Sequence, residues 1–147
     1  RNLLIEDSRL VNVSGNTFRR HTPDYGTGVR ITGSENITFT GCGIHDETDT
    51  GQPGLSALLE LAHCQRISIT GSQFIDGVIG VAATDCAHVT LTGNTLHDTR
   101  SVPVAKHAVQ FTGTSTGHLV ANNTISKTSG DPVAGDAQAN GNVIAAQ

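Results

Sequence analysis

The stretch VTLTGNTLHD, residues 89–98, alternates apolar and polar side chains and then turns at a Gly-Asn pair. Two earlier stretches repeat its pattern, ITFTGCGIHD at 37–46 and ISITGSQFID at 67–76. Alternation with a period of two, rich in β-branched residues, is typical of β-strands. Repeats of this length indicate a solenoid, in which each repeat forms one coil and packs against its neighbours.

Three apolar positions recur in every repeat, and their spacing is nearly constant. The first set is Leu3, Val29, Leu59, Val81 and Val109. The second set is Val13, Phe39, Ile69, Leu91 and Val120. The third set is Phe18, Ile44, Phe74, Leu96 and Ile125. The second position follows the first by 10 residues four times and by 11 once, and the third always follows the second by 5. The remaining length variation falls between the third position and the next repeat.

This spacing predicts three short strands in each coil, with every strand hydrogen-bonded to its equivalent one coil away. Neighbouring coils of such a solenoid stand about 4.8 Å apart. We therefore predict an all-β fold, a parallel β-helix of five coils and a partial sixth, as one domain over residues 1–147. The coil with Leu3 and Ile5 has no cap, so we expect it to meet a missing N-terminal segment of a longer chain or another copy.

The composition argues against several classes of protein. The formal net charge is −4 and no basic run is present, which argues against binding nucleic acid through its phosphates. No apolar stretch approaches the roughly 20 residues that a membrane-spanning helix needs. Aromatic residues make up only 3% of the chain, so the core is not built around large rings.

The pattern resembles the right-handed parallel β-helix of the pectate-lyase-like superfamily. The matching turns are Gly15-Asn16, Gly93-Asn94 and Asn122-Asn123. In that family, inward Asn side chains stack as a ladder at this turn, whereas here Cys42 and Ser72 interrupt it. The resemblance implies a sugar-binding groove over the first sheet, beside the variable loops, and an extracellular or periplasmic protein that acts on polysaccharide.

An aspartate closes three of the repeats, at Asp46, Asp76 and Asp98. The register places these residues on successive coils about 5 Å apart, so their charges repel one another unless a cation lies among them. Such a column could supply a general acid and base or bind Ca²⁺ through its oxygens. The alternative is structural, because an Asp after a strand also accepts backbone N–H bonds and opens a loop. Asp76 lies in the shortest connection, so we expect its side chain to be the most accessible.

The outward positions of the first strand set include Arg30, Glu60 and Gln110. Arg30 and Glu60 lie on adjacent coils, where they could form an ion pair across the strands. In a functional interpretation, Arg30 binds a uronate carboxylate and Glu60 acts as an acid, a base or a calcium ligand.

Basic and aromatic residues close to these strands could contribute to the same groove. Lys106 and His107 precede the fifth first-sheet strand, and β-helix lyases often use a basic residue as the Brønsted base. Tyr25, the only Tyr, could stack on a sugar ring. None of the three belongs to a specific motif.

Cys64 and Cys86 also share a register position, in the turn between the first and second strands. Stacked parallel side chains about 4.8 Å apart are too far from each other for a relaxed disulfide. We therefore predict a buried pair of free thiols. Cys42 is alone in its own turn.

Two functions fit these observations. The first is a polysaccharide-processing enzyme module of the glycoside hydrolase, lyase or epimerase type, without a certain cofactor but with Ca²⁺ as an option. The second is a non-catalytic β-helix of a spike, an adhesin or a carbohydrate-binding protein, in which the loops only recognise glycans.

Overall fold

A computed structural model describes residues 2–20, 28–47 and 57–145. In these residues every regular element is a β-strand, and none belongs to a helix long and apolar enough to cross a membrane. The first of three sheets holds β1 (Leu3–Glu6), β4 (Val29–Thr32), β7 (Leu59–Ala62), β10 (Ile79–Thr84), β13 (His107–Thr112) and β16 (Val133–Ala134). The second sheet holds β2 (Asn12–Ser14), β5 (Glu35–Thr40), β8 (Gln65–Thr70), β11 (Ala87–Thr92), β14 (Leu119–Ala121) and β17 (Gln138–Asn140). The third sheet holds β3 (Thr17–Arg20), β6 (Gly43–Asp46), β9 (Gln73–Ile75), β12 (Thr95–His97), β15 (Thr124–Ser126) and β18 (Val143–Ala145).

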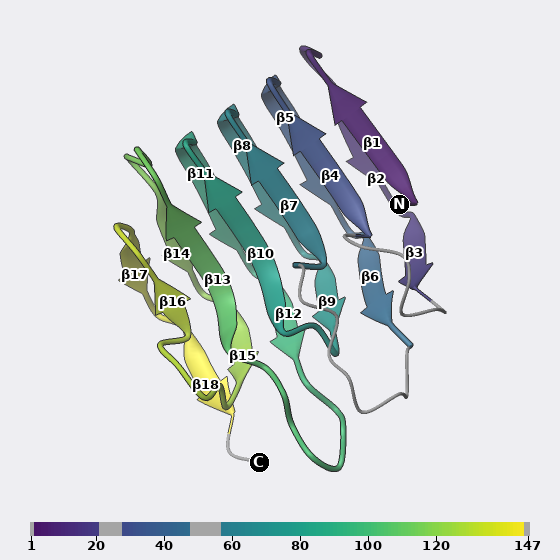
Figure 1. Cartoon of the computed structure of the whole chain (residues 1–147), viewed down its shortest axis with the longest axis vertical. Helices are drawn as coiled ribbons and strands as arrows, with labels where there is room; N and C mark the ends of the chain where they lie inside the picture. Colours follow the sequence, from purple (N-terminus) through teal and green to yellow (C-terminus); the bar gives the residue numbers. More distant parts are fainter. Residues whose placement is uncertain (1, 21–27, 48–56, 146–147) are drawn as a thin grey trace.

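Each strand pairs in parallel with its equivalent in the next coil, so that β1 and β16 lie at opposite ends of the first sheet (Figure 1). The register aligns Phe39, Ile69, Leu91 and Val120 in one column, and all four side chains are fully buried. The predicted all-β parallel β-helix is therefore confirmed. Each sheet has six strands within the described ranges, so the shorter set β16, β17 and β18 follows the five predicted coils.

One backbone conformation, repeated coil after coil, turns the chain from one sheet to the next. After the first sheet, φ lies between +46 and +68 at Asp7, Gly33, His63, Asp85 and Gly113. After the second sheet, φ lies between +55 and +67 at Gly15, Gly41, Gly71, Gly93, Asn122 and Gly141. The left-handed conformation costs roughly 1–2 kcal/mol for a residue with a Cβ atom. This cost explains why Gly recurs at the second of these turns.

Inward side chains at the second turn form a hydrogen-bonded ladder. The Asn94 backbone N–H donates to Asn123 Oδ1, and the Ser72 N–H donates to Asn94 Oδ1, both at 2.9 Å. The Cys42 N–H then donates to Ser72 Oγ at 3.1 Å. Ser72 and Cys42 break the run of Asn side chains, as predicted, but the hydrogen bonds continue because a hydroxyl oxygen can replace the amide oxygen.

His118 is an exception in the apolar core. It occupies a column that Ile37, Ile67 and Val89 fill in earlier coils, and it is only 3% exposed. Its ring stacks on Phe111 with centroids 4.0 Å apart, and its Nδ1 accepts a hydrogen bond from the Val89 N–H at 3.1 Å. Nε2 has no hydrogen-bond partner among the described residues. Burial lowers the pKa of His118, which favours the neutral ring.

The first and last coils differ in how well their apolar side chains are covered. Ile5 is 8% exposed and Leu3 is half-buried, whereas Ile144, the register partner of the fully buried Ile125, is 47% exposed. The expected association at the Leu3 and Ile5 end stays a prediction.

Candidate functional site

The outward face of the first sheet carries opposite charges on neighbouring coils. Arg30 in β4 and Glu60 in β7 are register partners, and Arg30 Nε lies 3.9 Å from Glu60 Oε2. Each side chain is 35% exposed. The distance exceeds that of a hydrogen bond, and Arg30 Nε is buried without a hydrogen-bond partner among the described residues. The ion pair is therefore present but loose, and because Nε itself is buried, only the exposed remainder of the Arg30 side chain is accessible to a ligand.

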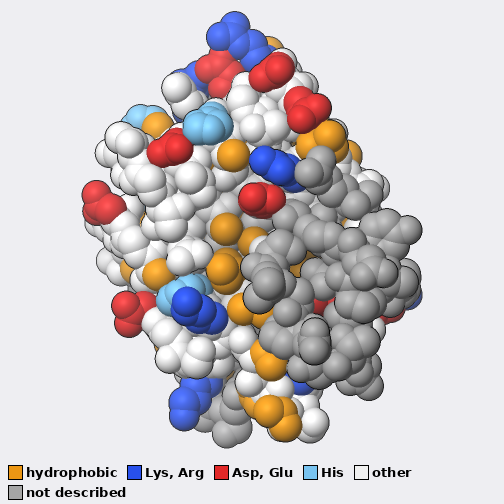
Figure 2. Space-filling view, viewed as in Figure 1, with side chains coloured by type: hydrophobic (Ala, Val, Ile, Leu, Met, Phe, Trp, Pro, Cys, Tyr) orange, Lys and Arg blue, Asp and Glu red, His pale blue; other side chains and the backbone are white. Residues whose placement is uncertain are grey.

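Small, amide and hydroxyl side chains continue this face beyond the ion pair. Ala82 in β10 and Gln110 in β13 follow Glu60 in the same column. The parallel outward column runs from Glu6 through Thr32, Ala62, Thr84 and Thr112. In Figure 2, seen from the side of the first sheet, apolar side chains gather in the middle of the molecule, with charged ones around them. The face therefore offers hydrogen-bonding groups beside apolar surface.

A cation lies among the three predicted aspartates. Asp46 and Asp98 are buried, and Arg100 reaches both of them from the loop that follows β12. Its Nη2 lies 3.6 Å from Asp46 Oδ2, and its Nη1 lies 3.5 Å from Asp98 Oδ1. Arg100 supplies the positive charge that a column of stacked carboxylates needs. Sequence reasoning missed this residue, although a cation two positions after the last aspartate was the signal that could have identified it.

Asp98 also holds together the two ends of its loop. Its Oδ2 accepts hydrogen bonds from the backbone N–H groups of Val104 at 2.6 Å and Ala105 at 2.8 Å. Its Oδ1 accepts one from the Arg100 N–H at 3.2 Å, and the side chain is 0% exposed. These hydrogen bonds fit the structural alternative for the aspartates, in which an Asp after a strand accepts backbone N–H bonds and opens a loop.

Asp76 is half-buried and more accessible than Asp46 and Asp98, as its short connection predicts. The Thr99 hydroxyl lies 2.9 Å from each carboxylate oxygen of Asp76, and the Thr99 backbone N–H donates to Oδ1. Asp76 therefore anchors the start of the same loop while keeping part of its surface in contact with solvent.

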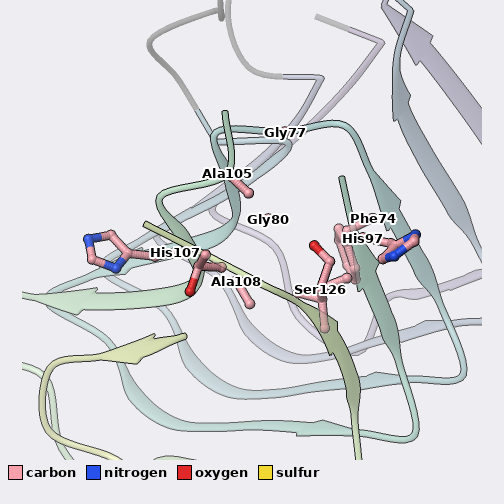
Figure 3. A pocket seen from close by; sticks show the side chains of 10 residues that line it. Phe74, Gly77, Gly80, His97, Ala105, His107, Ala108 and Ser126 are labelled. Atoms are coloured by element: carbon pink, nitrogen blue, oxygen red, sulfur yellow. The ribbon is translucent and has the colours of Figure 1, made fainter. Parts of the chain in front are cut away.

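Lys106 and His107 lie side by side in the chain but differ in exposure. Lys106 is exposed, whereas His107 is 9% exposed and its Nδ1 lies 2.7 Å from the Asp131 carbonyl oxygen. Figure 3 shows His107 and His97 on opposite sides of a small pocket, with Ser126 between them. The cavity volume is about 10 Å³, which is enough for about one water molecule and too small for a sugar.

Two further predictions concern Tyr25 and a metal. Tyr25 lies outside the described residues. Within the described ranges, no three side chains of His, Cys, Asp or Glu lie together as a metal site. The guanidinium of Arg100 lies beside two carboxylates of the aspartate column, and the binding of Ca²⁺ stays a prediction.

Comparisons with known proteins agree with this architecture. Residues 2–145 match the family described as the right handed beta helix region. No curated protein matches the chain at a significant level. A solved structure of a "putative glycosyl hydrolase" from Parabacteroides merdae matches with a TM-score of 0.63 and 12% identity, over 92% of this chain and 79% of that one. At this identity the likeness shows the fold alone. The chain belongs to the right-handed β-helix family.

Proposed function

We propose that this chain is a polysaccharide-processing β-helix module that binds an acidic glycan along the outward face of its first sheet. The observation that carries the proposal is the loose Arg30–Glu60 pair, in which Arg30 Nε and Glu60 Oε2 are 3.9 Å apart and each side chain is 35% exposed. Guanidinium and carboxylate groups form strong charge-assisted hydrogen bonds, which makes a uronate the matching ligand.

The neighbouring groups extend this binding site along the coils. Gln110 can both donate to and accept from sugar hydroxyls, and Thr84 and Thr112 present hydroxyl groups 2.9 Å apart on the same face. Lys106, exposed just before β13, adds a positive charge for a second acidic unit. The four residues occupy two neighbouring coils, so a short oligosaccharide running along the solenoid axis can contact more than one of them.

Hydrolysis is the reaction class that we propose for this site. The solved structure from Parabacteroides merdae with a similar fold is described as a "putative glycosyl hydrolase". Hydrolysis needs one carboxyl group as acid and another as base or nucleophile. Asp46 and Asp98 are buried against Arg100, so we assign the chemical roles to Glu60 and Asp76, whose side chains have access to solvent. For a lyase or epimerase, Arg30 would instead neutralise the uronate while a base removes the C5 proton.

Glycan binding without catalysis is the second candidate function. The pocket between His97 and His107 is too small for a sugar, and the Arg30–Glu60 face consists of open strand positions. An open face of this kind is sufficient for recognition by a spike, an adhesin or a carbohydrate-binding protein.

A substrate screen with matched variants tests both candidates. Reducing-sugar release, unsaturated-uronate formation and binding are measured on a panel of neutral and acidic polysaccharides, with and without chelator. Arg30→Gln is expected to weaken binding of acidic glycans by roughly 10- to 100-fold, the equivalent of about 1.5–3 kcal/mol. Glu60→Gln and Asp76→Asn are expected to abolish turnover while binding persists.

The control variant is Glu35→Gln, which removes a carboxylate that is ion-paired with Arg9 and Arg66 away from the first sheet. It should bind and turn over glycans like the wild type. Binding with no turnover in the wild type selects the second candidate. Unchanged binding in Arg30→Gln, together with unchanged turnover in Glu60→Gln, would show that this face is not the site.

A further inference from the structure

A hollow lies outside the turn that follows the first sheet, over the first three coils. Its volume is about 240 Å³. Two serines line it together with Asp7, Arg9, Gly33, Glu35, His63 and Gln65. No aliphatic or phenyl side chain is among the lining residues. We propose that this hollow binds one neutral sugar unit through its hydroxyl groups, at a site separate from the outward face of the first sheet.

The hollow exists because one position in a column of the turn has no side chain. Asp7, Gly33 and His63 directly follow β1, β4 and β7, so they occupy equivalent positions on successive coils. Two coil spacings of about 4.8 Å separate the backbones of Asp7 and His63, and Gly33 lies between them. At Gly33 φ is +59, and a Cβ there would collide with the carboxylate of Asp7. The gap is therefore one coil wide and opens beside this carboxylate.

The fixed charges around the hollow cancel. One carboxylate oxygen of Glu35 pairs with Arg9 and the other with Arg66. Because both oxygens are paired, Glu35 forms part of the wall and does not contact the ligand. The two guanidiniums balance the two carboxylates of Asp7 and Glu35. Since binding sites match the charge of their ligands, this balance favours an uncharged ligand.

The groups that remain available include both donors and acceptors. Within the described ranges, no donor or cation pairs with the Asp7 carboxylate. Gln65 Oε1 accepts a hydrogen bond from Arg66 Nη1 at 3.2 Å, which leaves the NH₂ group of Gln65 to donate. The Ser8 hydroxyl donates to the Glu6 carbonyl oxygen at 2.7 Å and can still accept. A hydroxyl group both donates and accepts, so adjacent sugar hydroxyls can donate to Asp7 while another accepts from Gln65.

The volume of the hollow limits the ligand to one sugar unit. Pockets for drug-sized molecules usually have at least about 300 Å³. At about 30 Å³ for each water molecule, the hollow holds about eight waters, which is about the space of one sugar ring. A longer glycan would have to extend beyond the hollow, whereas a single neutral unit fits within it.

Binding of neutral methyl glycosides to the full chain tests the proposal. Methyl glycosides of glucose, galactose and mannose are titrated into ¹⁵N-labelled protein, with the methyl glycosides of glucosamine and glucuronate as charged comparators. Asp7→Asn removes the charge of one acceptor and should keep the turn, because Asn tolerates the left-handed conformation that Asp7 adopts at φ +46. Gln65→Ala removes the amide donor from an exposed position. Asp136→Asn is the matched control, since Asp136 is exposed and lies between β16 and β17 at the other end of the solenoid.

At least one neutral glycoside is expected to shift the amide signals of Gly33, Ser34 and Gln65 until they saturate. Asp7→Asn should weaken this binding by about 10-fold, because it removes a charge-assisted hydrogen bond. Gln65→Ala should weaken it by about 3-fold, and Asp136→Asn should bind like the wild type.

Equal affinity in Asp7→Asn and the wild type would overturn the proposal. So would the absence of shifts with every neutral glycoside, equal binding of the charged comparators, or weaker binding in Asp136→Asn. Shifts confined to Arg30 and Glu60 would also overturn it, while they would leave the proposed site on the first sheet in place.

Discussion

Removal of the Asp98 carboxylate should destabilise the protein through its loop. In Asp98→Ala, the backbone N–H groups of Arg100, Val104 and Ala105 lose the acceptors that now lie at 3.2, 2.6 and 2.8 Å. The Arg100 guanidinium also loses one of its two carboxylates. At about 1 kcal/mol for each lost backbone bond, the expected cost is about 3 kcal/mol, and a broken buried ion pair can raise it toward about 5 kcal/mol. This is a large part of the 5–15 kcal/mol that is typical of a domain.

Urea unfolding followed by circular dichroism measures this cost. The matched control is Asp85→Ala, because Asp85 is 37% exposed and accepts one bond from the Thr114 N–H at 2.8 Å. We expect a loss of about 1 kcal/mol for the control and a clearly larger one for Asp98→Ala, at an unchanged m-value. Trypsin should also cleave after Arg100 faster in Asp98→Ala than in the wild type. An Asp98→Ala variant as stable as the control would refute the loop-anchoring role.

Three further substitutions test the account at separate places. The His118→Val variant should lose less stability in acid than the wild type. Because burial lowers the pKa of His118, the unfolded state binds more protons than the folded state. The free energy of unfolding of the wild type therefore falls as the pH drops below 6.5, the pKa of His118 in the unfolded chain. Chemical unfolding at pH 5 and pH 8 measures how the free energy of unfolding changes with pH. An equal change in the variant and the wild type would show that the ring is not buried and neutral. Asn94→Ala should lower the free energy of unfolding by about 2–3 kcal/mol, because it leaves the Ser72 N–H without an acceptor in the core. Calorimetry measures this loss, and a loss below about 0.5 kcal/mol would contradict the hydrogen-bonded ladder. Gly113→Ala should destabilise the protein more than Gly93→Ala, although both residues have a positive φ. A Cβ at position 113 would lie 2.2 Å from a carboxylate oxygen, whereas a Cβ at position 93 meets nothing within 4 Å. Equal melting temperatures of the two variants would contradict this difference.

The register could be predicted from the sequence because a strand has a period of two. A slip of one residue would move Phe39 and Ile69 from the core to the surface, so the constant five-residue spacing admits one alignment of the coils. The same alignment correctly placed Arg30 beside Glu60 and Cys64 beside Cys86.

The loop contacts could not be predicted in the same way. Arg100 reaches Asp46 only because the loop after Asp98 folds back, and that conformation depends on hydrogen bonds to Val104 and Ala105 rather than on a periodic pattern. His118 was missed for a different reason. His118 precedes Val120 by two residues, as Val89 precedes Leu91, so the alignment itself was available and the polar residue in this apolar column was the signal that could have identified it.

The central claim is that an acidic glycan binds on the outward face of the first sheet. Chemical-shift mapping with ¹⁵N-labelled protein and a uronic-acid tetrasaccharide tests it most directly. The account predicts shifts that saturate together at Arg30, Glu60 and Gln110, and no change at Thr40 and Thr70 on the outward face of the second sheet. Shifts confined to the second sheet, or none at all at saturating tetrasaccharide, would contradict it.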